Sequence, residues 1–114
     1  MSVLVEAQTW VRVAEYAALE PEHGVAALVD GVQIAIFRTH DGAVYALSNS
    51  DPFTGAQVIS RGIVGTRGDA PTVASPLHKQ VFDLRTGACF DDPTLALTVF
   101  AVRVRDGAVE VGAP

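Results

Sequence analysis

The chain has 114 residues, of which 49% are apolar and 18% charged, and its formal net charge at pH 7 is −5. This length suits one hydrophobic core, so we expect a single domain over residues 1–114, with an ordered core from about residue 9 to 111. The acidic balance and the scattered basic residues argue against a nucleic-acid surface. The apolar runs are too short to cross a bilayer and the first residues lack a signal-peptide pattern, so we expect a cytoplasmic protein without membrane contact.

The chain contains a single cysteine, Cys89, which excludes a disulfide within the chain. Cysteine usage therefore gives no indication of an oxidising compartment. The sequence pattern places no histidine near Cys89, so a small, buried apolar role is favoured over a nucleophilic one.

Short runs of β-branched residues, separated by turn residues, predict a mostly β protein. The Asp-Gly pairs at 30–31, 41–42 and 106–107 favour hairpins, because Asp-Gly tolerates the positive φ angles of type I′ turns. Only residues 13–24 are expected to hold a helical turn, which ends before a proline. The architecture is expected to be a small antiparallel sandwich built from hairpins. The expected strands are 9–13, 25–29, 32–39, 43–48, 72–75, 81–84, 88–90, 97–105 and 108–111.

The segment from residue 48 to 80 interrupts this hairpin series, because it is rich in glycine, proline, asparagine and serine. Two loop tips are expected there, around residues 50–56 and 75–80, flanking short strands. The glycines of residues 62–69 have no helix after them, so this stretch is interpreted as a loop and not as a dinucleotide-binding turn. Loops on a rigid β scaffold are the usual place for function.

Two strings in this segment carry a resemblance to a known family. They are DPFTGAQVIS, which starts at Asp51, and SPLHKQVFDLRTG, which starts at Ser75. Together with the order of the expected strands, they resemble a Rieske iron–sulfur domain, in which Cys-x-His and Cys-x-x-His loops hold a [2Fe-2S] cluster. The resemblance places Asp51 and Phe53 at the ligand positions of the first loop, and Ser75 and His78 at those of the second.

A Rieske cluster requires two thiolates and two imidazoles, and of these four ligands only His78 is present. The resemblance therefore implies a Rieske-like antiparallel β-sandwich of small sheets without a bound cluster. A mononuclear metal site on Asp51 and His78 would lack a third ligand. For Asp51, which precedes a proline, a turn-starting role with its side chain bonded to backbone amides is favoured over a general base. For His78, a partly exposed ring bonded to nearby backbone is favoured over metal ligation.

A closer resemblance is carried by residues outside the ligand positions. The strings Asn49–Pro52, Ser60–Ile63 and Ser75–Phe82 resemble the small subunit of assimilatory NAD(P)H-dependent nitrite reductase, and the likeness extends from Trp10 to Val111. In such enzymes the large subunit carries FAD, a [4Fe-4S] cluster and sirohaem, and reduces nitrite to ammonium. The resemblance implies that this chain is a non-catalytic small subunit with no cofactor of its own and with the large subunit as its partner.

The two loops also supply a candidate docking surface with an apolar centre and a charged rim. Its members are Phe53, Arg61, Leu77, His78 and Lys79, and Arg67 is expected near them. Docking through a different face of the sandwich is the alternative. A second hypothesis for the whole chain is a stand-alone, cluster-less Rieske-like module that binds another oxidoreductase or a small ligand. An electron-carrying ferredoxin is contradicted by the missing thiolates.

Overall fold

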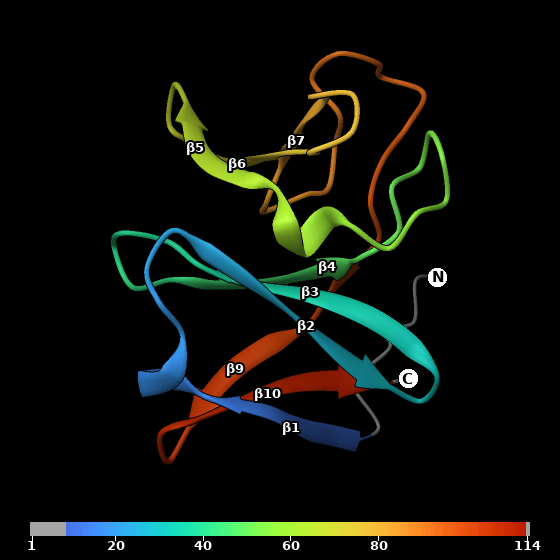
Figure 1. The fold of residues 1–114 in the computed structure, drawn as a ribbon. Helices are drawn as coiled ribbons and strands as arrows, with labels where there is room; N and C mark the ends of the chain where they lie inside the picture. Colours follow the sequence, from blue (N-terminus) through green and yellow to red (C-terminus); the bar gives the residue numbers. More distant parts are fainter. Residues whose placement is uncertain (1–8, 114) are drawn as a thin grey trace, which may run out of the picture.

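A computed structural model describes residues 9–113, and these residues form three small antiparallel sheets stacked in layers (Figure 1). The strand orders are β1-β10-β9, β2-β3-β4-β8 and β5-β6-β7. The mostly β, Rieske-like sandwich expected from the sequence is confirmed. Two short 3₁₀ helices are present, η1 (Tyr16–Ala18) and η2 (Ile59–Arg61). The strands are β1 (Thr9–Glu15), β2 (His23–Val29), β3 (Val32–Arg38), β4 (Val44–Ser48), β5 (Ile63–Arg67), β6 (Ala70–Ala74), β7 (Val81–Asp83), β8 (Val99–Phe100), β9 (Val102–Arg105) and β10 (Ala108–Ala113).

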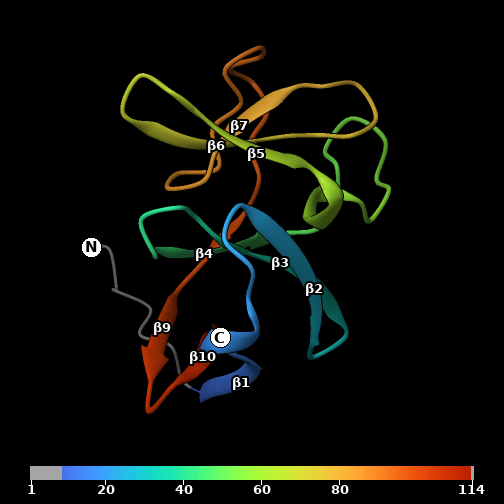
Figure 2. The ribbon, with the colours of Figure 1, turned by 60° about the vertical axis from the view of Figure 1, so that its left-hand side comes forward.

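The sheet that contains β3 is the middle layer (Figure 2). It buries side chains on both of its faces. Because successive side chains of a strand point to opposite faces, the apolar run Ile34–Phe37 serves two cores. Ile34 and Ile36 pack in one core with β10, while Ala35 and Phe37 pack in the other with β6 and β7. We call the second of these the upper core, because it lies between the middle sheet and the β5-β6-β7 sheet.

The predicted turns are confirmed at two of the three Asp-Gly pairs. Asp30 and Gly31 have φ angles of 50° and 79°, and Asp106 and Gly107 have angles of 51° and 77°, as a type I′ turn requires at both central residues. The β3–β4 turn is longer, and there only Gly42 of the pair has a positive φ. The expected helical turn is η1.

Three predictions of local structure are wrong. Residues 88–90 do not form a strand, because they make only isolated bridges, Phe82 with Cys89 and Ala88 with Ala96. Residues 62–69 are not a loop, because Ile63–Arg67 forms β5 and pairs with β6 across a turn at Gly68. Val64 packs against the upper core, so burial outweighs the weak strand preference of the neighbouring glycines. Residues 97–105 are not one strand either. The segment is interrupted at Ala101, because β8 pairs with β4 in the middle sheet while β9 pairs with β10 in the lower one.

A close backbone approach fixes η2 on the middle sheet. A Cβ atom at Gly24 of β2 would lie 2.5 Å from both the Ser60 carbonyl oxygen and Cε1 of Phe37. Only glycine fits this spacing, so the segment that leads out of the first loop rests directly on the sheet. Among residues 9–113, no helix is long and apolar enough to cross a membrane.

Candidate functional site

A hydrogen bond between two buried side chains joins the two loops. Asp51 in the first loop has no exposed surface, and Ser75 in the second is 1% exposed. The Ser75 hydroxyl donates to Oδ2 of Asp51 over 2.5 Å. Asp51 and Ser75 are the first ligand positions of their loops in the Rieske resemblance, so this bond stands where that resemblance would place two thiolates.

The other oxygen of the Asp51 carboxylate organises the first loop. Oδ1 accepts hydrogen bonds from the backbone N–H groups of Phe53, at 2.8 Å, and Thr54, at 3.3 Å. The backbone of Asp51 also closes the loop, since its N–H donates to the Ala56 carbonyl and its own carbonyl accepts from Gly55. The predicted turn-starting role of Asp51 is confirmed, and its carboxylate is committed to holding the two loops in place.

Asn49 ties the first loop to the scaffold, a role that the sequence did not predict. Its side-chain oxygen accepts from the Ser60 backbone N–H at 2.7 Å. Its amide group donates to Oε1 of Gln33 on β3 and to the Gln57 carbonyl. The signal was an asparagine in a loop rich in turn residues, since such side chains readily bond to backbone groups. Its partners are too distant in sequence to be named without the fold.

The second loop is a tight turn closed by Ser75. The Ser75 N–H donates to the Gln80 carbonyl at 2.9 Å, and the Lys79 N–H donates back to the Ser75 carbonyl at 3.0 Å. Lys79 has a φ of 63°, in the left-handed region. His78 is exposed, as expected, but within the described residues its ring makes no hydrogen bond to backbone.

The structure places the predicted docking residues Phe53 and Leu77 on two loops that a hydrogen bond joins. Phe53 follows Asp51 by two positions and is 38% exposed, and Leu77 follows Ser75 by two positions and is 46% exposed. Both therefore lie on segments that the Asp51–Ser75 bond holds side by side, with Lys79 exposed on the second of them.

The arginines flanking these loops lie in two different places. Arg61 is exposed on η2, where the first loop ends. Arg67 is at the far end of the β5–β6 hairpin from the second loop, with its guanidinium over the Phe90 ring at 4.9 Å. The expectation that Arg67 joins the loop residues is therefore wrong.

The residues at the Rieske ligand positions do not fit a [2Fe-2S] cluster. Two thiolates are required there, and the side chains present are a carboxylate and a hydroxyl in direct contact. The Ser75 hydroxyl oxygen and Oδ2 of Asp51 are 2.5 Å apart, which is the separation of a hydrogen bond. The two oxygens therefore bind each other. Cys89 is 4% exposed in the upper core, as predicted for a small apolar residue.

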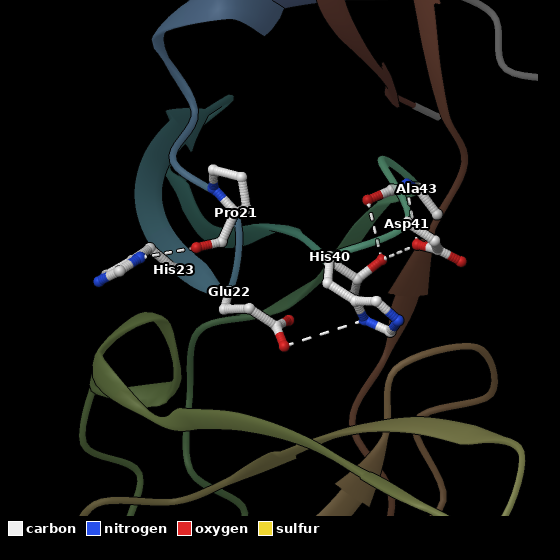
Figure 3. Close-up of polar contacts among 7 residues, drawn as sticks. Pro21, Glu22, His23, His40, Asp41 and Ala43 are labelled. Carbon is white, nitrogen blue, oxygen red and sulfur yellow. Dashed lines mark hydrogen bonds and ion pairs between the residues drawn. The ribbon is translucent and has the colours of Figure 1, made fainter.

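The other two histidines, His23 and His40, lie at the end of the middle sheet where β2 begins and β3 ends. Figure 3 shows His40 facing Glu22, with 3.9 Å between Nδ1 and Oε1, and His23 bonded to the Pro21 carbonyl at 2.9 Å. His40 and Glu22 border a polar groove of about 240 Å³ between the β3–β4 turn and β5. No group of three or more His, Cys, Asp or Glu side chains placed to bind a metal occurs in residues 9–113.

The Asp83 carboxylate, whose partner Arg85 lines this groove, carries a shifted pKa. Burial of Asp83 disfavours its ionised form, but hydrogen bonds from the side chain and backbone N–H of Arg85 outweigh that cost and lower its pKa. The guanidinium lies 3.1 Å from Oδ2. The pair is a structural contact of the β7 turn, since both groups are already satisfied by one another.

The sequence matches the Rieske-like [2Fe-2S] domain family over residues 9–112. It is 41% identical over 103 residues to the nitrite reductase (NADH) small subunit of Salmonella typhimurium, with 90% of this chain and 95% of that protein covered. The chain belongs to this Rieske-like family of nitrite reductase small subunits. The crystal structure of a Mycobacterium tuberculosis protein described as an NADH-dependent nitrite reductase small subunit superimposes with a TM-score of 0.92 at 45% identity, covering 96% of this chain and 98% of that one.

A second kind of relative is much longer. The nitrite reductase [NAD(P)H] large subunit of Klebsiella oxytoca is 40% identical over 103 residues, which are 90% of this chain and 11% of that protein. A segment similar to this chain thus occurs within a chain that is named as a large subunit.

Proposed function

We propose that this chain is the non-catalytic small subunit of an assimilatory NAD(P)H-dependent nitrite reductase, and that it acts by docking to the large subunit. The observation that carries this proposal is the family membership over nearly the whole chain. The Klebsiella oxytoca relative supports it, because a similar segment and a large subunit share one polypeptide there. In this proposal the protein is cytoplasmic and binds no nucleic acid. FAD, the [4Fe-4S] cluster and sirohaem belong to the large subunit, which reduces nitrite to ammonium.

The geometry of the two loops supports docking rather than chemistry. Asp51 and Ser75 are buried and bonded to each other, so no reactive group of this pair faces solvent. The exposed residues beyond them are Phe53 and Leu77, with cationic side chains alongside. An apolar centre with a charged rim is the usual composition of a protein interface, and a pre-ordered loop loses little conformational entropy on binding.

The test is a binding measurement with the purified large subunit of the same organism. We expect the wild-type chain to bind and Leu77→Ser to weaken binding about tenfold, the loss typical of truncating an interface anchor. Val104→Ser is the matched control, because Val104 is 47% exposed on β9 in the lower sheet. The absence of wild-type binding would refute the proposal and favour a stand-alone module that serves another oxidoreductase or a small ligand.

A further inference from the structure

The outer face of the β5–β6–β7 sheet carries a row of apolar side chains. The strand register aligns Ile63 with Ala74 and Ala74 with Val81, and the Phe90 N–H extends the row by donating to the Val81 carbonyl at 2.8 Å. Neighbours of the opposite parity, such as Val73 and Phe82, are buried in the upper core. Because side chains alternate along a strand, this row faces away from the core.

The two ends of this row are unusually exposed for large apolar side chains. Ile63 is 76% exposed, which is more than any other large apolar residue of residues 9–113, and Phe90 is 41% exposed. Along the chain, Ala74 leads into the second loop through the buried Ser75 and the exposed Pro76 to the exposed Leu77.

Most basic residues without a carboxylate partner among residues 9–113 lie near the ends of this sheet. Of the eight basic residues, Arg12, Arg85 and Arg103 pair with carboxylates, and Arg38 donates to the Leu19 carbonyl and lies over the Tyr16 ring. The other four have no carboxylate within 4.0 Å in the described part of the chain, and they are Arg61, Arg67, Lys79 and Arg105.

Three of these four residues border the apolar row. Arg61 precedes Ile63 by two positions and Lys79 precedes Val81 by two positions, so both lie beyond the same end of the sheet. Arg67 ends β5 and lies over Phe90. Asp91 follows Phe90 directly in the sequence, and its Oδ2 accepts a hydrogen bond from the Val81 N–H at 2.8 Å. Three cations and one carboxylate, that of Asp91, therefore border the row in a chain of net charge −5.

We propose that the outer face of the β5–β6–β7 sheet, centred on Ile63 and Phe90, docks a protein partner whose matching surface is apolar with carboxylates at its border. The apolar centre accounts for affinity, and the three cations account for the choice of an acidic rim on the partner. This inference rests on the proposed function, because the partner is taken to be the large subunit. It extends the docking surface from the two loops to the row of Ile63, Ala74, Val81 and Phe90 at one end of the sheet.

The test measures the affinity of the large subunit for variants of the full chain at low and high salt. Ile63→Ser is expected to weaken binding about tenfold, and Arg61→Glu combined with Arg67→Glu to weaken it by a similar factor at low salt. The effect of the charge reversals should shrink at about 0.5 M salt, where exposed charges are screened. Val104→Ser and Arg105→Glu, both on β9, are the matched controls and should bind as the wild type does. Unchanged melting temperatures would show that the variants fold.

The outcomes separate this inference from the proposed function. If Leu77→Ser weakens binding while Ile63→Ser and the arginine reversals bind as the wild type does, the loops dock and the sheet face does not, and the inference is overturned. If the wild-type chain does not bind at all, both are overturned. Charge reversals that strengthen binding would show a cationic partner surface and would also contradict the inference.

Discussion

The hydrogen bond between Ser75 and Asp51 allows a quantitative prediction. Ser75→Ala removes the donor that serves Oδ2 of Asp51 and leaves a fully buried carboxylate oxygen without it. A hydrogen bond to a charged group contributes about 1.5–3 kcal/mol, and a buried acceptor left unpaired adds its desolvation cost. Oδ1 keeps its two backbone donors, so we place the loss of unfolding free energy at about 2–3 kcal/mol. For a domain of this size, that lowers the melting temperature by roughly 8–15 °C.

The assay is thermal and urea unfolding of Ser75→Ala beside Ser60→Ala. Ser60 is half-buried in the same region, and its hydroxyl makes no hydrogen bond among residues 9–113, so this control should change the unfolding free energy by less than about 0.5 kcal/mol. Asp51→Asn with and without Ser75→Ala completes a double-mutant cycle, in which a coupling energy above about 1 kcal/mol is expected. If Ser75→Ala is as stable as Ser60→Ala, the bond does not hold the loops together and the reasoning is refuted.

Three further predictions follow from the scaffold. Gly24→Ala should cost about 1–3 kcal/mol of unfolding free energy because its Cβ would lie 2.5 Å from the Ser60 carbonyl, whereas Gly65→Ala, with its nearest contact at 3.6 Å, should be close to neutral in the same denaturation. The lowered pKa of Asp83 means that its pairing with Arg85 stabilises the fold above the unfolded pKa near 3.8 and is lost as pH falls through the lower folded value. Arg85→Gln should therefore lower the unfolding free energy at pH 6 and much less near pH 2.5, and an equal cost at both pH values would contradict this. Cys89 should react with a thiol reagent only as fast as the fold opens, so rapid labelling of the native protein would show that it is not buried.

Local signals were sufficient to predict most of the strands and turns. Alternating apolar runs predicted β1 to β4, and the Asp-Gly pairs predicted three hairpins, two of which have the φ angles of a type I′ turn. The prediction failed where tertiary contacts override local preference. The glycines around β5 favoured a loop, yet Val64 pairs with Val73 and packs in the upper core. The sequence from Leu97 to Arg105 contains no residue that predicts a break. The chain changes sheet at Ala101 because β8 pairs with β4 whereas β9 pairs with β10, and local sequence does not reveal these pairings.

The site was only partly predictable, because its main contact also joins residues that are far apart in the sequence. The resemblance located Asp51 and Ser75 at two ligand positions, and Asp-Pro predicted the turn bonds of the first loop. The bond between the two side chains spans 24 residues, so no local pattern could reveal it. A signal was nonetheless present, since both cysteines of a Rieske cluster bind the same iron and a donor and an acceptor at those positions would be expected to meet. Arg67 was expected near the loops because the sequence did not predict the β5–β6 hairpin, and Arg67 lies at the turn of that hairpin.

The hydrogen bond between Ser75 and Asp51 joins the two loops at the positions where a Rieske cluster would need two thiolates. The most direct measurement is the iron content and visible absorption spectrum of the full chain, purified after expression in iron-replete cells. We expect no stoichiometric iron and no charge-transfer bands. Stoichiometric iron with visible charge-transfer bands would contradict it and would show that the chain carries electrons itself.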